Sequence, residues 1–187
     1  KIIHISTDYV FDGTSEVPLK ETDTPDPINV YGLTKLKGEE ALVASGAAYV
    51  IIRTAWVYST YGANFVKTMM RLMSEREEIG VVADQVVTPT YARDLAQVIM
   101  KVAEADVFVE GVYHFSNEGK ISWHEFATAV KEIKGYTPTI NAIGSEAFPT
   151  PAKRPKFSLL DKTKIKEVYH VNVPNWKDSL KEMLSKV

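Results

Sequence analysis

Two short apolar runs place the strongest constraint on the fold of this chain. Residues 48–54 are apolar without interruption from Tyr49 to Ile52, and residues 2–7 form a second run that ends in small polar side chains. Continuous hydrophobicity is typical of a strand that is buried on both faces of a parallel sheet. Residues 31–45, between the two runs, have helical periodicity. A strand, a helix and a second buried strand in this order predict an α/β fold with a largely parallel sheet.

The remainder of the chain continues this alternation of strands and helices. Residues 79–82 and 111–115 are predicted as strands, with a loop over 84–90. Ser122 is a candidate N-cap for the helix that follows it. The predicted helices cover residues 64–76, 91–105, 123–134, a short stretch near Lys162, and 175–186. Residues 138–155 are rich in Pro, which indicates a smaller, looser lobe beside the main sheet.

The composition is that of an ordinary globular domain, and it argues against several functions. The 187 residues are 45% apolar and 25% charged, and the net charge of −2 gives no support to nucleic-acid binding. The sequence contains no cysteine, so it offers no disulfide, thiolate nucleophile or cysteine metal site. The four histidines lack metal-ligand spacing, and no apolar run is long enough to span a bilayer. We therefore predict no metal, no membrane partner and no nucleic-acid partner.

Tyr31 and Lys35 are the first indication of chemistry. They are four residues apart and share one face of the predicted helix. A phenol has a pKa of about 10 in water, and a cation held beside it favours the phenolate and lowers that pKa. Thr7, at the end of the preceding strand, could place a hydroxyl near a carbonyl oxygen. These groups suit reduction of a ketone or oxidation of an alcohol, although a half-buried Tyr with a surface Lys one turn away fits the same spacing.

The motifs around this pair are more specific than the pair itself. Ser6-Thr7-Asp8-Tyr9-Val10-Phe11 together with Tyr31-x-x-x-Lys35 resembles the extended short-chain dehydrogenase/reductase family. Later motifs, in order and nearly to the end of the chain, resemble the dTDP-4-dehydrorhamnose reductases within that family. These motifs are Arg53-Thr54-Ala55-Trp56-Val57-Tyr58, Gly62-Ala63-Asn64-Phe65, Asp84-Gln85-Val86-Val87-Thr88-Pro89-Thr90, Gly111-Val112-Tyr113-His114-Phe115, Ser122-Trp123-His124-Glu125-Phe126 and Pro149-Thr150-Pro151-Ala152-Lys153-Arg154-Pro155.

This resemblance implies a fold and a cofactor. The fold is Rossmann-like, a doubly wound parallel sheet of which only the C-terminal part is present, with a smaller α/β substrate-binding lobe. Residues 1–60, rejoined by about residues 84–116, would belong to the NAD(P)-binding domain, and residues 61–83 and 117–187 to the lobe. The cofactor would be NADPH or NADH, yet the sequence contains no Gly-x-x-Gly-x-x-Gly fingerprint for its pyrophosphate. We therefore expect that an N-terminal part is missing and that this fragment alone is inactive.

The resemblance also implies roles for individual residues. Tyr31 is expected to protonate the C4 oxygen of a dTDP-4-keto-6-deoxysugar, while Lys35 lowers the pKa of the phenol and binds the nicotinamide ribose. Thr7 would hydrogen-bond the same oxygen. The other expected substrate contacts are Asp8, Tyr9, Trp56, Asn64 and Arg154, the last two toward the nucleotide diphosphate. The product, dTDP-L-rhamnose, would be made in the cytoplasm for cell-surface polysaccharides, and the enzyme could be a homodimer.

Two alternative functions share part of the same motifs. One is another nucleotide-sugar epimerase or dehydratase, but such dehydratases carry Glu directly after the Thr-Asp of this strand, where this chain has Tyr9. The other is the non-catalytic regulatory β subunit of methionine adenosyltransferase, which has the same strand and Tyr-x-x-x-Lys motifs. The motif that contains Trp56 favours the reductase, because a regulatory subunit has reason to lose a sugar-facing Trp.

Overall fold

A three-stranded parallel sheet is the centre of the computed structural model, which describes residues 1–187. The strand order is β1-β2-β7, with β1 at Ile2–Thr7, β2 at Tyr49–Thr54 and β7 at Gly111–His114. Ile51 and Ile52 in the middle strand are 0% exposed, so this strand is buried on both faces as its composition predicts.

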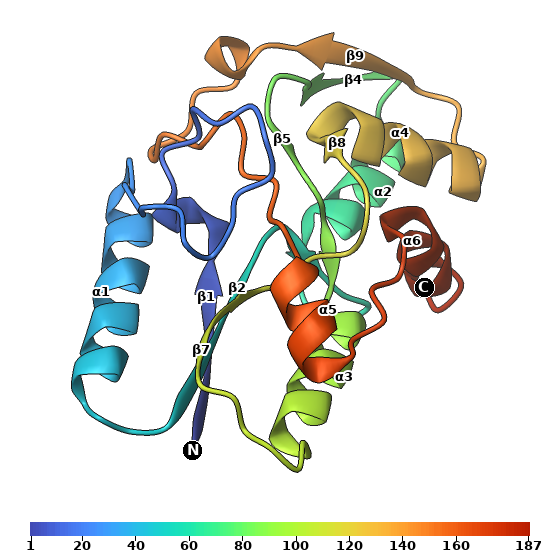
Figure 1. The fold of residues 1–187 in the computed structure, drawn as a ribbon. Helices are drawn as coiled ribbons and strands as arrows, with labels where there is room; N and C mark the ends of the chain where they lie inside the picture. The colour runs from blue at the N-terminus through green and yellow to red at the C-terminus, as the bar shows by residue number, and fades with distance from the viewer.

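Helices cover both faces of this sheet. α1 (Val30–Ala44) lies on one face, and α3 (Ala92–Ala103) and α5 (Thr163–Tyr169) lie on the other (Figure 1). Apolar side chains of α3 and α5 form one buried cluster with those of β2 and β7, which includes Val50, Leu95, Tyr113 and Ile165. The α/β fold with a parallel sheet covered on both faces is therefore confirmed.

A second group of elements lies beyond the carboxyl end of β1, at the top and on the right of Figure 1. Its members are α2 (Phe65–Glu75), α4 (Trp123–Lys134), α6 (Trp176–Leu184) and the parallel pair of β4 (Glu78–Val82) and β9 (Thr139–Ile143). Val66, Phe126 and Met183 in its core are 0% exposed. The division of the chain into two units stays a prediction, and α5, although it belongs to the predicted lobe in sequence, packs against the first sheet.

Strands are present in the predicted loop 84–90 and in the Pro-rich segment predicted to belong to a looser lobe. β9 lies inside the Pro-rich segment 138–155. The strand is stabilised by backbone pairing with β4 and by Ile140, which packs against the apolar cluster around Met73. Within the expected loop 84–90, β5 (Val86–Val87) pairs with β8 (Ile121–Ser122), and β6 (Thr90–Tyr91) pairs with β3 (Val57–Tyr58). All these pairings join distant segments, so a local sequence pattern gives little sign of them.

The helix ends follow from local chemistry. Ser122 caps α4 as predicted: its Oγ accepts from the Glu125 N–H, and the Glu125 carboxylate accepts from the Ser122 N–H. Gly135 ends this helix in the left-handed conformation at φ 69°, which glycine adopts at little cost. No helix of the structure combines the length and apolar character that a membrane crossing requires.

Candidate active site

The site begins where β1 ends, at Thr7, Asp8 and Tyr9. Thr7 caps the short 3₁₀ helix Asp8–Val10: its Oγ1 accepts from the Tyr9 N–H at 3.2 Å and donates to Asp8 Oδ1 at 3.1 Å. Ser158, from the far end of the chain, donates its hydroxyl to Asp8 Oδ2 at 2.5 Å. Thr7 and Asp8 are 5% and 2% exposed, so this network is held away from solvent. The Thr7 hydroxyl and the Asp8 carboxyl therefore form one coupled unit.

Burial dominates the ionisation of Asp8. It raises the pKa of this carboxyl to about 6, against the opposing effect of the hydrogen bonds from Ser158 and Thr7. An ionised Asp8 carboxylate accepts a hydrogen bond from the Thr7 hydroxyl. A protonated Asp8 can leave that hydroxyl free to donate to another acceptor. The protonation state of Asp8 thus decides what the Thr7 hydroxyl can donate to.

This raised pKa makes stability depend on pH through Asp8. An unfolded Asp has a pKa of about 3.9, so between about pH 4 and 6 the folded chain retains a proton that the unfolded chain has lost. The contribution of Asp8 to unfolding free energy therefore falls by about 3 kcal/mol as the pH rises through that window, and stays at the lower value above it. In urea denaturation, the unfolding free energy of Asp8→Asn minus that of wild type should therefore rise by about 3 kcal/mol between pH 4 and pH 7.5.

A control for this titration is available at Asp12. Its pKa is lowered by hydrogen bonds from Thr14, so Asp12→Asn should shift the pH dependence in the opposite direction. A difference between wild type and Asp8→Asn that stays constant from pH 4 to 7.5 would contradict a raised Asp8 pKa.

Tyr31 stands over this strand end because α1 begins close against it. Asn29 caps α1 by accepting from the Gly32 N–H at 2.8 Å, and a Cβ on Gly32 would lie 2.1 Å from the Tyr9 carbonyl oxygen. Only glycine permits this approach. The rings of Tyr9 and Tyr31 meet edge to face, with centroids 5.7 Å apart, and Tyr31 is 53% exposed. The phenol is therefore near the Thr7–Tyr9 segment and open to an incoming molecule.

Lys35 lies one turn further along the same helix and reaches the same strand. Its Nζ donates to the Ile5 carbonyl oxygen of β1 at 2.7 Å, not to the Tyr31 phenol. An ammonium group has three N–H donors, so two remain after this bond. The predicted pairing of Lys35 with Tyr31 stays a prediction, and the structure adds an anchor for Lys35 that the sequence did not suggest.

Trp56 follows the end of β2, which is the parallel neighbour of β1. Its backbone has φ 45°, and its indole stacks on that of Trp123 with ring centroids 3.4 Å apart and planes at 14°. Since Thr7 and Thr54 are paired in register, Trp56 and the Thr7–Tyr9 segment both follow the carboxyl edge of the same sheet. In open α/β sheets this edge is where ligands bind.

The two candidates for the nucleotide diphosphate have different surroundings. Asn64 caps α2, accepting from the Lys67 N–H at 3.2 Å, and donates to the Ser59 carbonyl at 2.7 Å. Its side-chain amide is thus already engaged in local structure. Arg154 is exposed, and its charge acts on Tyr9, although burial outweighs it and raises the Tyr9 pKa to about 12. Arg154 therefore interacts electrostatically with the Thr7–Tyr9 segment, whereas the hydrogen bonds of Asn64 are to Ser59 and Lys67.

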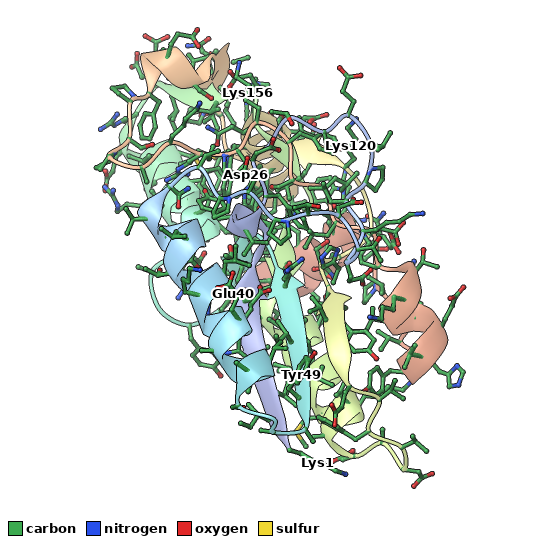
Figure 2. All side chains as sticks on the ribbon, turned by 60° about the vertical axis from the view of Figure 1, so that its left-hand side comes forward. Lys1, Asp26, Glu40, Tyr49, Lys120 and Lys156 are labelled. Atoms are coloured by element: carbon green, nitrogen blue, oxygen red, sulfur yellow. The ribbon has the colours of Figure 1, made fainter.

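Figure 2 shows which end of the sheet carries the site. Lys1 and Tyr49, at the amino ends of β1 and β2, lie at one end, whereas Asp26 and Lys156 lie beyond the other. Lys156 belongs to the segment that contains Ser158, and Asp26 precedes α1. The carboxyl end of the sheet is therefore covered by loops that bring remote residues to the site.

Three residues of this site were not predicted from the sequence, namely Ser158, Trp123 and Gln85, whose Oε1 accepts from Trp123 Nε1 at 3.2 Å. Trp123 and Gln85 belong to motifs that carry the resemblance, but no role followed from their residue types alone. Ser158 is 150 residues from Asp8 in the sequence, so only the folded chain joins them. The structure contains no group of three or more His, Asp or Glu side chains arranged to hold a metal ion.

Comparison with known proteins identifies a consistent set of relatives. The family model described as the RmlD substrate binding domain matches residues 1–187. The dTDP-4-dehydrorhamnose reductase of Aggregatibacter actinomycetemcomitans is 42% identical over 192 residues, which cover 97% of this chain and 65% of that protein.

Solved structures agree with this match. The Bacillus anthracis dTDP-4-dehydrorhamnose reductase in complex with NADP has a TM-score of 0.95 and 39% identity, over 100% of this chain and 66% of that one. The Clostridium acetobutylicum dTDP-4-dehydrorhamnose reductase has a TM-score of 0.94 and 42% identity, over 99% and 65%. The chain therefore spans about two thirds of the length of these relatives, and the Rossmann-like fold is confirmed.

Proposed function

The chain belongs to the RmlD substrate-binding domain family, and from this premise we propose that it forms the substrate-binding and proton-donating part of an NAD(P)H-dependent reductase. The reaction is reduction of the C4 keto group of dTDP-4-dehydro-6-deoxy-L-mannose to dTDP-L-rhamnose. The observation that carries this proposal is the grouping of the Tyr31 phenol, the Thr7 hydroxyl and the Lys35 ammonium at the carboxyl end of β1. The names of the relatives support the choice of sugar nucleotide.

The residues present fit the nicotinamide end of a cofactor. Tyr31 is half exposed, and Lys35 retains two N–H donors after its bond to Ile5, so both can hydrogen-bond a ribose hydroxyl. When bound, the reduced nicotinamide supplies a hydride to C4 of the sugar. NADPH is the first candidate because the crystal structure of the Bacillus anthracis relative is a complex with NADP. NADH remains the alternative.

The side chains of this chain would handle the proton. Tyr31 donates its phenolic proton to the C4 oxygen, and the positive charge of Lys35 stabilises the phenolate that results. Thr7 donates a hydrogen bond to the same oxygen when its hydroxyl is not directed at Asp8. Burial of Asp8, Thr7 and the backbone around Gly32 keeps these groups in a fixed arrangement before the substrate arrives.

A direct assay tests the proposed activity. Protein expressed from the complete gene should oxidise NADPH when dTDP-6-deoxy-L-lyxo-4-hexulose is added, and dTDP-L-rhamnose should appear in equal amount. The matched control omits the keto sugar, and NADPH should then not be oxidised. Absence of NADPH oxidation with the dTDP-linked substrate would contradict the proposal.

The alternatives receive less support. Tyr9 stands where a dehydratase needs a carboxylate, and its pKa of about 12 makes it a weak acid at neutral pH. Similar proteins at 40–42% identity carry reductase names, which disfavours a regulatory subunit. A cytoplasmic location and a homodimer are part of the same proposal. The proposed homodimer would not be held together by a metal ion bound at Arg93. This side chain is a cation, which does not ligate metals, and it pairs with Glu182.

A further inference from the structure

Trp56 has an unusual backbone for a bulky residue. Its φ of 45° lies in the left-handed region, which few residues other than glycine, Asn and Asp adopt. Such a conformation persists only where the surroundings hold it, and it is often found at functional sites. The contacts of the Trp56 side chain therefore show what holds it.

Trp123 covers one face of the Trp56 indole. The two rings are parallel within 14° and their centroids are 3.4 Å apart, so no sugar ring fits between them. Trp123 is the first residue of α4 and also packs on Phe65, the first residue of α2, with centroids 4.5 Å apart. Trp56 is thus fixed against the ends of two helices, and only its other face and its edges can contact a ligand.

A hydrogen-bonded chain fixes the orientation of Trp123. Its Nε1 donates to Gln85 Oε1 at 3.2 Å, and Gln85 Nε2 donates to Ser145 Oγ at 2.9 Å. Ser145 in turn donates to Asp84 Oδ1 at 2.6 Å. An indole N–H can only donate, so it requires the Gln85 oxygen to face it and the Gln85 amide nitrogen to face Ser145. Gln85 is 8% exposed, and this orientation is therefore held in a largely dry setting.

We propose that Trp123 is a positioning residue that sets the plane of the Trp56 indole for the deoxyhexose ring, and that Gln85 holds Trp123 in that orientation. This inference rests on the proposed function, because the sugar ring is the ligand that the second face of the half-buried Trp56 indole would meet. A sugar that packs its C–H groups on an indole gains from an apolar face in a fixed plane. Trp123 and Gln85 act through Trp56 and touch neither the reacting carbonyl nor the cofactor.

The first experiment is spectroscopic and independent of catalysis. Two stacked indoles whose transition dipoles are rotated relative to each other give a coupled pair of bands of opposite sign in circular dichroism. This couplet should be present in wild type and in Trp176→Phe, which removes the third Trp of the chain, and absent from Trp56→Phe and Trp123→Phe. In Gln85→Leu, which keeps both indoles, it should weaken. A Gln85→Leu couplet equal to that of wild type would overturn the role of Gln85.

The second experiment measures steady-state kinetics with protein expressed from the complete gene. Trp123→Leu and Gln85→Leu should raise KM for the dTDP-keto sugar, by up to about tenfold for Trp123→Leu, because a fixed aromatic contact is lost. Their kcat should change less than about twofold, which is the signature of lost binding common to ground state and transition state. Trp123→Phe, which keeps a ring against Trp56, should recover part of the KM.

The outcomes separate this inference from the function on which it rests. A wild type without turnover overturns the proposed function and, with it, the sugar-facing role of Trp56. A wild type that turns over, combined with an unchanged KM in Trp123→Leu and Gln85→Leu, overturns this inference alone. A kcat that falls while KM stays constant also overturns it. Gln85→Leu keeps the test decisive if Trp123→Leu does not fold.

Discussion

Replacement of Tyr31 by Phe should lower kcat by about 10²–10⁴-fold, the range typical of a lost general acid. The change removes the hydroxyl that would protonate the C4 oxygen and retains the ring that meets Tyr9 edge to face. KM should change much less, because the apolar contacts of the ring are kept. The measurement is kcat at saturating dTDP-keto sugar, with protein expressed from the complete gene.

The control for this variant is Tyr61→Phe. Tyr61 is 84% exposed and lines a different surface depression, together with Ser59, Arg93 and Lys186. Loss of its hydroxyl should leave kcat and KM unchanged. Unfolding free energies of both variants should stay close to wild type, since neither hydroxyl makes an internal hydrogen bond. A Tyr31→Phe enzyme that keeps more than half of the wild-type kcat would show that another group delivers the proton.

The sequence predicted well those features that depend on neighbouring residues. The continuous apolar run at 49–52 identified a strand buried on both faces, and Ser122 identified the start of α4. The order of Thr7, Tyr9 and Tyr31 also predicted a candidate site, because a strand end and the first turn of the next helix are adjacent in a parallel α/β unit, and the rings of Tyr9 and Tyr31 do meet edge to face. In each case the residues that supported the prediction lie in the same element, or the same connection, as the feature that they predict.

Other features depend on pairing across the chain, and the sequence did not predict them. β9 contains strand-favouring residues at Thr139, Ile140 and Ile143, but it lies in a Pro-rich segment and its pairing partner β4 is distant in the sequence. The bond from Ser158 to Asp8, and the stack of Trp123 on Trp56, similarly join segments that only the complete fold brings together. Lys35 is an intermediate case. The helical period predicted which face of α1 carries its side chain, but it did not predict the Ile5 carbonyl as its hydrogen-bond partner.

A buried ion pair beneath α1 is the last such feature, and it carries the largest expected effect on stability. Arg53 on β2 donates through Nη2 to Glu39 on α1 at 2.7 Å and through Nε at 3.0 Å, and both side chains are 4% exposed. Ser6 on β1 donates its hydroxyl to the same carboxylate. The helix that carries Tyr31 and Lys35 is thereby tied to two strands of the sheet.

Arg53→Met should lower the unfolding free energy by about 3–5 kcal/mol at pH 7. The substitution leaves the Glu39 carboxylate in an almost dry site with the Ser6 hydroxyl as its hydrogen-bond donor, and desolvation of that charge is what destabilises the fold. The measurement is urea denaturation of this chain. A loss below about 1 kcal/mol would show that the carboxylate has access to water or to a proton and is not the buried ion that the contacts indicate.

The double variant Glu39→Gln/Arg53→Met separates the charge from the packing. It removes both charges and keeps an amide that can accept the Ser6 hydroxyl, so it should be more stable than Arg53→Met alone. Arg53 Nη1 has no hydrogen-bond partner in its buried position, which means that the native pair is itself incompletely satisfied. Removal of both charges should therefore cost less than removal of one. A double variant as unstable as Arg53→Met would mean that the guanidinium stabilises the sheet through its packing on Phe11 instead of through Glu39.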